Sequence, residues 1–327
     1  MRILVIGGAG YIGSHTARIL KQRGHEVIVL DNMVFGHRDA VGDLPLIKGD
    51  LSDRALLETV FRECKIEAVI HFAAFAFVGE SVTDPAKYYQ NNLVNTLTLL
   101  DAMRACDVKR IVFSSTCATY GVPARVPIDE ELPQDPINPY GRTKLAIEWA
   151  LKDYSSAYGL GFAALRYFNA AGASPVGDIG EDHHPETHLI PLVLQVALGQ
   201  RSHIEIYGTD YPTPDGTCIR DYIHVDDLAE AHALAAAKLA DGSQLIYNLG
   251  TGHGYSVREV IDICREVTGK PISVKESPRR PGDPPVLVAS AEKANRELGW
   301  KPRYPELRQI VETAWRWHES HPQGFAE

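Results

Sequence analysis

The stretch "ILVIGGAGYIGSHTARIL" at residues 3–20 decides the fold. A β-branched apolar run leads into Gly7, Gly10 and Gly13, spaced G-x-x-G-x-x-G, and then into an amphipathic segment. Glycines permit a sharp turn and let a pyrophosphate approach the backbone without an intervening Cβ. The helix that follows presents free N–H groups and its positive dipole end to that phosphate. The stretch therefore predicts a strand, a phosphate-binding turn and a helix.

An acidic residue stands at the end of the next apolar run, where it would lie beside this turn. Asp31 follows Gly10 by about 20 residues, where a carboxylate would bind a ribose 2′-OH and repel a 2′-phosphate. A purely structural turn with a helix-capping Asp would explain the glycines. It would not explain why a strand, a glycine turn, a helix and an acidic strand end follow one another in this order. The pattern predicts NAD rather than NADP as the cofactor. Asp50, after the third run, could reach the adenine or simply form a turn.

Strand-like and helix-like segments alternate through the first half of the chain. The expected strands are Arg2–Gly7, Glu26–Asp31, Leu46–Gly49, Ala68–Phe72, Arg110–Ser115, Ala163–Phe168 and Leu245–Gly250. The expected helices are Tyr11–Arg23, Arg54–Cys64, Ala86–Ala105, Pro139–Tyr158 and one from about Val225. This alternation predicts an α/β fold with a doubly wound parallel Rossmann sheet.

A Gly-, Pro- and acid-rich passage from Gly172 marks a change of organisation. We expect an NAD-binding Rossmann domain at residues 1–172 plus 222–252. A smaller, discontinuous α/β lobe for the substrate would comprise residues 173–221 plus 253–327.

Composition excludes several classes of protein. A net charge of −9 over 327 residues argues against a nucleic-acid surface. No apolar run approaches the roughly 20 residues of a membrane span. Five scattered cysteines without a C-x-x-C pair favour free thiols in a reducing cytoplasm. We expect a cytoplasmic protein with neither nucleic acid nor membrane as partner.

A second motif lies at "INPYGRTKLAIEWA", residues 137–150. Asn138 and Pro139 are typical of a helix start, and Tyr140 and Lys144 then lie one turn apart. Upstream, "FSSTCATYG" ends a predicted strand with hydroxyls that include Thr116. A tyrosine is a poor base near neutral pH, so Lys144 and a positively charged nicotinamide would have to lower its pKa. Thr116 would position a substrate hydroxyl, and the three side chains predict removal of a proton from an alcohol.

These motifs together resemble the extended short-chain dehydrogenases/reductases. The stretches "GGAGYIGSHT", "DNMVFGHR", "LRYFNAAGA", "YPTPDGTCIRDYIHV" and "PRRPGDPP" are similar to the UDP-glucose 4-epimerase family, and the similarity runs nearly the whole length. The resemblance implies interconversion of UDP-glucose and UDP-galactose through a 4-keto sugar, with tightly held NAD. It also implies a homodimer formed through the helices near residues 86–105 and 139–158.

The resemblance assigns roles position by position. The implied cofactor residues are Gly7, Gly10, Tyr11, Ile12, Gly13, Asp31, Asn32, Asp50, Leu51, Phe72, Ala73, Ala74, Asn91, Ser114, Tyr140, Lys144 and Phe168. The implied substrate residues are Thr116, Asn169, His188, Leu189, Glu205, Ile206, Tyr207, Arg220, Arg280, Asp283 and Leu287. Guanidinium groups suit a diphosphate, although either arginine could instead form an interdomain ion pair.

Some positions depart from the family pattern. Ala76 replaces a lysine that some members use on the cofactor, and His188 replaces an asparagine. Leu287 stands where pocket size decides whether N-acetylated sugars fit, which leaves UDP-GlcNAc open as a substrate.

The same residues argue against other reactions that use this cofactor. A 4,6-dehydratase needs an Asp–Glu pair directly after the threonine, where this chain has Cys117 and Ala118, and a decarboxylase usually has Glu near this point. A non-catalytic NAD sensor typically loses the Tyr or the Lys. The stretch "DHHPETH" at residues 182–188 invites a zinc interpretation, but it lacks a cysteine or acidic ligand set at recognised spacing, so no metal is expected.

Overall fold

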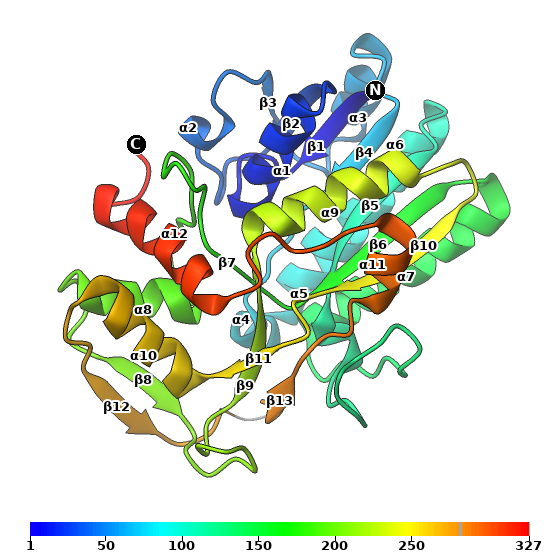
Figure 1. Cartoon of the computed structure of the whole chain (residues 1–327). Helices are drawn as coiled ribbons and strands as arrows, with labels where there is room; N and C mark the ends of the chain where they lie inside the picture. Colours follow the sequence, from blue (N-terminus) through cyan, green and yellow to red (C-terminus); the bar gives the residue numbers. More distant parts are fainter. Residues whose placement is uncertain (281–282, 327) are drawn as a thin grey trace.

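The computed structural model describes residues 1–280 and 283–326, and its main feature is a seven-stranded sheet (Figure 1). The strand order is β10-β6-β5-β4-β1-β2-β3, and every pairing within it is parallel. The strands are β1 Arg2–Ile6, β2 Glu26–Asp31, β3 Leu46–Lys48, β4 Ala68–His71, β5 Arg110–Thr116, β6 Gly161–Tyr167 and β10 Gln244–Leu249. The predicted doubly wound α/β fold is confirmed.

Helices cover both faces of this sheet. They are α1 Tyr11–Gln22, α2 Arg38–Val41, α3 Arg54–Glu63, α4 Val78–Thr83, α5 Pro85–Tyr88, α6 Asn95–Ala105, α7 Pro139–Tyr158, α9 Val225–Lys238 and α11 Glu292–Leu298. Alternate residues of each strand point to opposite faces. Ile3 and Val5 of β1 pack with α1 and α9, whereas Leu4 and Ile6 pack with α3, α6 and α7. Burial on both faces explains why the strands read as nearly continuous apolar runs.

The helix expected at residues 86–105 is interrupted. Tyr89–Val94 form a π-helical turn between α5 and α6. Within it Asn92 is buried and its side chain bonds both the N–H and the carbonyl of Phe75 at 2.9 Å. Single π turns of this kind often lie at functional sites. Here the turn brings Asn91 and Asn92 toward the loop that follows β4.

A second group of elements lies beside the large sheet. Strand β9 (Ile219–His224) pairs with β7 (Asn169–Ala171), β11 (Gly254–Ser256) and β13 (Val286–Leu287). Strands β8 (Ile204–Tyr207) and β12 (Val274–Ser277) form a separate parallel pair. Helices α8 (Leu189–Ala197), α10 (Val257–Thr268) and α12 (Leu307–Ser320) pack on β8 and β9 around a core of their own.

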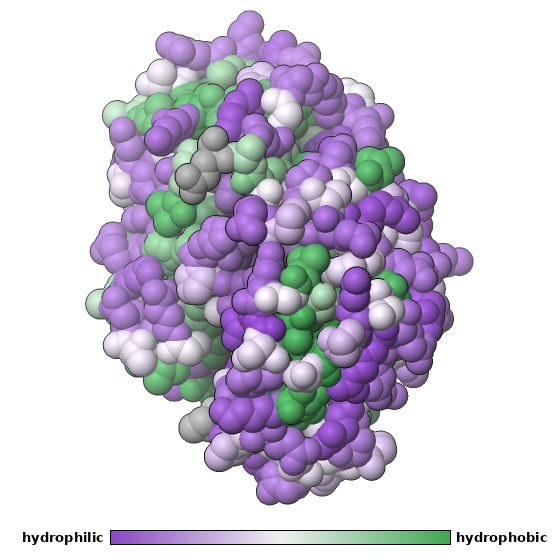
Figure 2. Space-filling view, turned by 90° about the vertical axis from the view of Figure 1, so that its left-hand side faces the viewer, coloured by the Kyte–Doolittle hydropathy of each residue, from purple (hydrophilic) through white to green (hydrophobic). Residues whose placement is uncertain are grey.

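The face that Figure 2 shows is mostly hydrophilic. Hydrophobic side chains gather there in a strip near the centre and in a broader group at the upper left. Among the described helices, none combines the length and the apolar character needed to cross a bilayer.

The order of the strands fixes where ligands bind. From β1 the chain runs outward through β2 and β3, and β4 then starts the other half of the sheet on the opposite side of β1. Ligands of open α/β sheets bind outside the carboxyl ends of the strands at such a switch point. The turn after β1 and the loop after β4 therefore border the expected cleft.

Candidate active site

The glycines of the turn after β1 are needed for two different reasons, which are close packing within the chain and space for a ligand. A Cβ on Gly7 would lie 2.6 Å from the Ala73 backbone nitrogen, and a Cβ on Gly13 would lie 2.1 Å from the Gly7 oxygen. These glycines are needed for the chain's own packing. A Cβ on Gly10 would meet only the Gly7 oxygen, at 3.5 Å, and Gly10 precedes α1 without any side-chain cap. The first turn of α1 also carries no acid. Open space at free helix N–H groups fits a bound phosphate.

Asp31 is fixed in place beside this turn. Its carboxylate accepts hydrogen bonds from the backbone N–H groups of Ala9, at 2.9 Å, and Met33, at 2.8 Å. Burial raises the pKa of Asp31, while these two hydrogen bonds oppose that rise. The side chain is therefore oriented without a cation, as a carboxylate that binds a ribose hydroxyl must be.

A small cavity of about 30 Å³ gathers many of the expected cofactor residues. Its lining includes Gly7, Asp31, Asn32, Asp50, Leu51, Ala73 and Asn91. Asn32 donates to Asp50 at 2.8 Å, so the ends of β2 and β3 are joined at this edge. The cavity, the turn and Asp31 together suit the adenosine half of a dinucleotide.

Other expected cofactor residues lie around the same end of the sheet. Ile12 packs on the core of the α1 face, and Phe72 packs on His232 with ring centroids 4.7 Å apart. Ala74 follows Ala73 and is partly exposed, and Phe168 packs in a small cluster with Tyr120.

Tyr140 and Lys144 project from the first turns of α7 as the spacing predicts. Asn138 caps the helix, accepting from the Gly141 N–H at 2.8 Å. Lys144 is 3% exposed, its Nζ donates to the Ser114 carbonyl at 2.8 Å, and Nζ lies 5.9 Å from the centre of the Tyr140 ring. The structure thus brings Tyr140, Lys144 and the end of β5 together.

Electrostatics at this pair differ from the sequence expectation. Burial raises the pKa of Tyr140 above its ordinary value, and hydrogen bonding by Thr116 opposes that rise only in part. Burial also lowers the pKa of Lys144 to about 7. The residues of the chain alone therefore keep the phenol protonated, and additional positive charge is needed to make it a base.

A buried ion pair anchors α7 behind this dyad. Arg166 of β6 binds Glu148 of α7 through two hydrogen bonds, of 2.9 and 2.5 Å. Ser115 donates to the same carboxylate at 2.6 Å, and Arg166 also donates to the Tyr120 hydroxyl at 2.8 Å. Removing one partner of such a pair leaves an unpaired buried charge. Sequence reasoning missed this network because no local pattern marks it.

Several expected substrate residues meet across the small sheet. Arg220 of β9 forms an ion pair with Asp283 and stands opposite Leu287 of β13. Leu287 packs against the cluster that holds Phe168 and Tyr120. Arg220 thus forms an ion pair, but with a residue of the same predicted lobe and not across the two domains, and its side chain is 13% exposed.

A second group gathers on the pair of strands β8 and β12. The Arg280 guanidinium lies 4.0 Å from the centre of the Tyr207 ring, and the Tyr207 hydroxyl donates to Glu205. Ile206, between them in β8, points the other way into the core and is 1% exposed. Only the backbone of Ile206 can therefore face a ligand.

The remaining substrate candidates lie nearer α8. Asn169 donates to the Asp221 carbonyl at 2.9 Å, so it is held at the centre of the small sheet. Leu189 packs on the core of α8. His188 directs its Nδ1 at Glu181 and Glu186, at 2.8 and 2.9 Å, rather than at any other substrate candidate.

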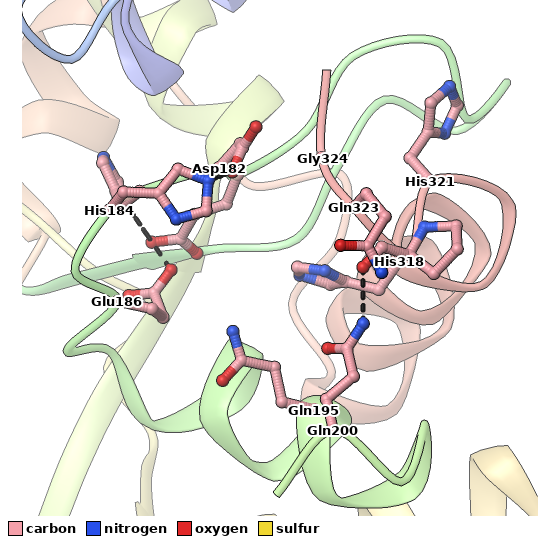
Figure 3. Close-up of a pocket in the computed structure, with 12 residues that line it drawn as sticks. Asp182, His184, Glu186, Gln195, Gln200, His318, His321, Gln323 and Gly324 are labelled. Atoms are coloured by element: carbon pink, nitrogen blue, oxygen red, sulfur yellow. Dashed lines mark hydrogen bonds and ion pairs between the residues drawn. The ribbon is translucent and has the colours of Figure 1, made fainter. Parts of the chain in front are cut away.

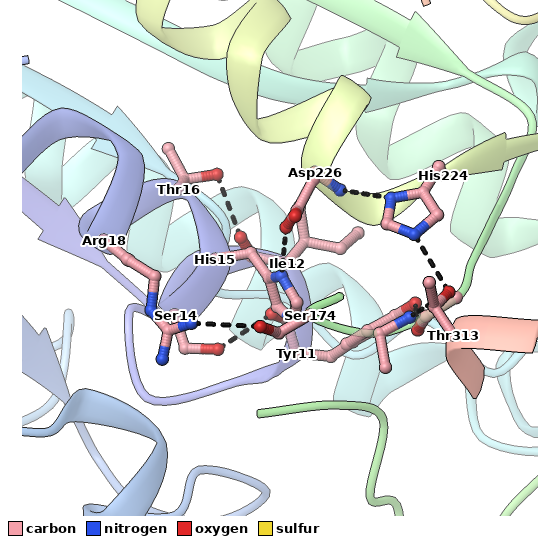
Figure 4. Close-up of polar contacts among 12 residues, drawn as sticks. Tyr11, Ile12, Ser14, His15, Thr16, Arg18, Ser174, His224, Asp226 and Thr313 are labelled. Carbon is pink, nitrogen blue, oxygen red and sulfur yellow. Dashed lines mark hydrogen bonds and ion pairs between the residues drawn. The ribbon is translucent and has the colours of Figure 1, made fainter. Parts of the chain in front are cut away.

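Tyr11 links the glycine turn to the start of the second lobe. Its hydroxyl donates to the Gly172 carbonyl at 2.6 Å. Figure 4 shows further contacts nearby: His15 lies 2.6 Å from Asp226, and Arg18 donates to Ser174. These bonds hold α1 against α9 and against the loop after β7.

The chain is similar to known proteins over nearly its whole length. Residues 3–250 match the NAD dependent epimerase/dehydratase family. The UDP-glucose 4-epimerase of Halalkalibacterium halodurans is 58% identical over 327 residues, covering 100% of this chain and 98% of that protein. The UDP-glucose 4-epimerase of Brucella ovis in complex with NAD is 51% identical with a TM-score of 0.92, covering 96% and 97% of the two chains. That of Bifidobacterium longum with NAD⁺ and UDP is 42% identical with a TM-score of 0.95, covering 99% and 100%.

Proposed function

The chain belongs to the NAD-dependent epimerase/dehydratase family and, within it, to the UDP-glucose 4-epimerases; from this premise we propose how its own residues perform the reaction. It is an enzyme that uses NAD, and we assign it the interconversion of UDP-glucose and UDP-galactose through a transient 4-keto sugar. The observation that carries the assignment is the pairing of half-buried Tyr140 with buried Lys144 at the end of β5, beside an open glycine turn.

Tyr140 is the proposed base. Its phenolate oxygen would take the proton of the sugar's C4 hydroxyl in one direction, and the resulting phenol would return it in the other, while Thr116 positions the sugar hydroxyl. Bound NAD⁺ supplies a hydride acceptor for C4 and a positive charge that favours the Tyr140 phenolate. This charge matters because burial alone raises the pKa of Tyr140.

Lys144 would orient the cofactor ribose and add positive charge. The Ser114 carbonyl holds its Nζ, and helix α7 is itself held by the Glu148–Arg166 pair. The dyad thus stays in one geometry while the sugar changes faces. Gly10, Asp31 and the small cavity around Asn32 are the proposed dinucleotide site.

The uridine diphosphate is assigned to the small sheet. Arg220 is held ready by Asp283, and Arg280 by the Tyr207 ring. Two guanidinium groups match the charge of a diphosphate. Leu287 packs where it would border the sugar, so UDP-GlcNAc is a second candidate substrate for a panel with UDP-galactose, UDP-GalNAc and UDP-xylose.

Dehydration is disfavoured by the residue after Thr116. Cys117 takes the place of the first acid of the dehydratases, and burial raises the pKa of its thiol to about 12. Such a group does not exchange a proton near neutral pH.

The direct test is conversion of UDP-galactose to UDP-glucose by the purified chain. Tyr140→Phe should abolish turnover and keep NAD bound, because only the hydroxyl is removed. The matched control is Tyr154→Phe, also on α7, whose hydroxyl bonds Asp101 instead. Near-normal activity of Tyr140→Phe would remove Tyr140 from the role of base, and absence of any conversion by the wild type would overturn the proposed function.

We also propose a homodimer built on α6 and α7. The π turn before α6 and helix α7 expose apolar side chains: Val94 is 43% exposed, Trp149 57% and Tyr158 50%. Light scattering should report two chains per particle, and Trp149→Glu should yield monomers; a wild-type monomer would contradict the proposal.

The five free cysteines keep a reducing cytoplasm as the proposed location.

A further inference from the structure

Four side chains with metal-ligating groups converge in the loop between β7 and α8. Glu181, His183, Glu186 and His188 each offer one ligand atom, and these atoms all lie within 4.8 Å of one another. The Nδ1 of His183 is 3.3 Å from Glu181 and 3.7 Å from Glu186. The Nδ1 of His188 is 2.8 Å from Glu181 and 2.9 Å from Glu186. Both imidazoles thus aim the same nitrogen at the same two carboxylates.

Two buried atoms of the cluster make no hydrogen bond, although both lie within ion-pair distance of another member. They are Oε1 of Glu181, a residue only 3% exposed, and Nδ1 of His183, which are 3.3 Å apart. Buried polar atoms are nearly always hydrogen-bonded, so each exception calls for an explanation. Both exceptions belong to one cluster and point into it, as the ligand atoms of a cation site do.

We propose that Glu181, His183, Glu186 and His188 bind a divalent transition metal, with zinc as the best fit. Zinc takes four ligands at the corners of a tetrahedron, and ligand atoms bonded at about 2.0–2.1 Å then lie about 3.3 Å apart. The four imidazole–carboxylate separations, 2.8 to 3.7 Å, lie around that value, with the two oxygens of Glu186 each facing one histidine. The set of one ligand atom from each residue spans at most 4.8 Å. Two imidazole nitrogens also suit zinc, whereas calcium and magnesium prefer oxygen ligands alone.

An access route and a structural purpose accompany the site. Glu181, His183 and Glu186 line a cavity of about 230 Å³ that also contacts His318 of α12 (Figure 3). His188 immediately precedes α8. A metal would tie the loop to the start of α8 and to Tyr11 at the glycine turn. His188 is also one of the expected substrate residues, so the test reads metal content and not turnover.

The sequence predicts no metal here, because no cysteine or acidic ligand set stands at a recognised spacing. The fold nevertheless brings two carboxylates and two imidazoles together. Glu181 stands two residues before His183, outside the spacings of known zinc motifs, and the turn of the loop brings it back to His188.

The test measures metal in untagged holoenzyme, since a histidine tag would bind metal itself. Chelator-treated protein is dialysed against zinc and assayed by elemental analysis, and cobalt is added in parallel as a spectroscopic probe. We expect one zinc per chain and an intense visible cobalt spectrum of four-coordinate type. Less than about one tenth of an equivalent, or only the weak spectrum of hydrated cobalt, overturns the proposal.

Variants assign the ligands. Glu181→Gln and His188→Asn should each lower zinc binding at least tenfold and remove the cobalt spectrum. His184→Gln is the matched control, because His184 lies in the same loop but is 80% exposed and pairs with Asp182. Circular dichroism and retained NAD identify folded variants, and two ligand variants guard against one that fails to fold. Unchanged binding in both folded ligand variants, or loss of binding in His184→Gln, overturns the assignment.

Discussion

Replacing Lys144 with methionine should make the protein more stable and inactive. Burial lowers the pKa of Lys144 from 10.5 to about 7. Each pKa unit corresponds to about 1.4 kcal/mol, so the charged amine costs the folded state about 5 kcal/mol below pH 7. Methionine fills similar space but leaves the Ser114 carbonyl unpaired, at a cost of about 1–3 kcal/mol. The variant should therefore gain about 2–4 kcal/mol at pH 6.

The pH dependence gives the test its sign. The pKa is lower in the folded than in the unfolded chain, so the unfolded chain binds more protons between pH 7 and pH 10.5. Across that window, the free energy of unfolding of the wild type should rise by about 1.4 kcal/mol per pH unit relative to that of the variant.

Urea unfolding of NAD-free protein at pH 6, 7, 8 and 9 measures the difference, because NAD bound to the folded state would add to it. Lys152→Met, a partly exposed lysine on the same helix, is the control and should show no such trend. A variant less stable than the wild type at pH 6, or a gap that stays constant with pH, refutes the reasoning.

Three further perturbations test the site and its surroundings. Gly10→Ala should change stability by less than about 0.5 kcal/mol yet weaken NAD at least tenfold, because its Cβ meets only the Gly7 oxygen, whereas Gly13→Ala should unfold at much lower urea. Equal effects of the two alanines on stability would contradict this difference. Asp31→Ser should reduce the preference for NAD over NADP at least tenfold in competition titrations, because it removes the charge that repels a 2′-phosphate; an unchanged preference would argue against that role. Burial lowers the pKa of His232 to about 4, below its unfolded value, so the folded state should lose about 1.4 kcal/mol per pH unit through this residue as pH falls from 6.5. Acid titration of His232→Gln should show a shallower loss, and an unchanged slope would exclude His232 as the cause.

The large sheet could be predicted because its information is local. Strands that are buried on both faces and the N-cap of α7 can be recognised from a few neighbouring residues. Pro139–Tyr158 is accordingly helical over the expected residues. The π turn could not be predicted, because it depends on Asn92 reaching the backbone of Phe75, which is distant in sequence.

The candidate site could be predicted only in part, because only some of its contacts are between residues close in sequence. Tyr140 and Lys144 share one helix turn, so spacing sufficed to place them together. The Glu148–Arg166 pair and the contact of Glu181 with His188 depend on how separate elements or turns of a loop come together. Likewise, alternation in β8 could not show which face is buried, so Ile206 was named beside Tyr207 although it points into the core.

The pairing around β9 has a consequence for synthesis of the chain. Its partner strands come from residues 169–171, 254–256 and 286–287, so the small sheet is complete only when most of the chain has been made. The glycine turn and Asp31, by contrast, leave the ribosome first. Since pairing over such separations folds slowly, we expect the sheet around β9 to form late. A chain stopped before residue 286 would lack one of the two strands that pair with β9 opposite Arg220.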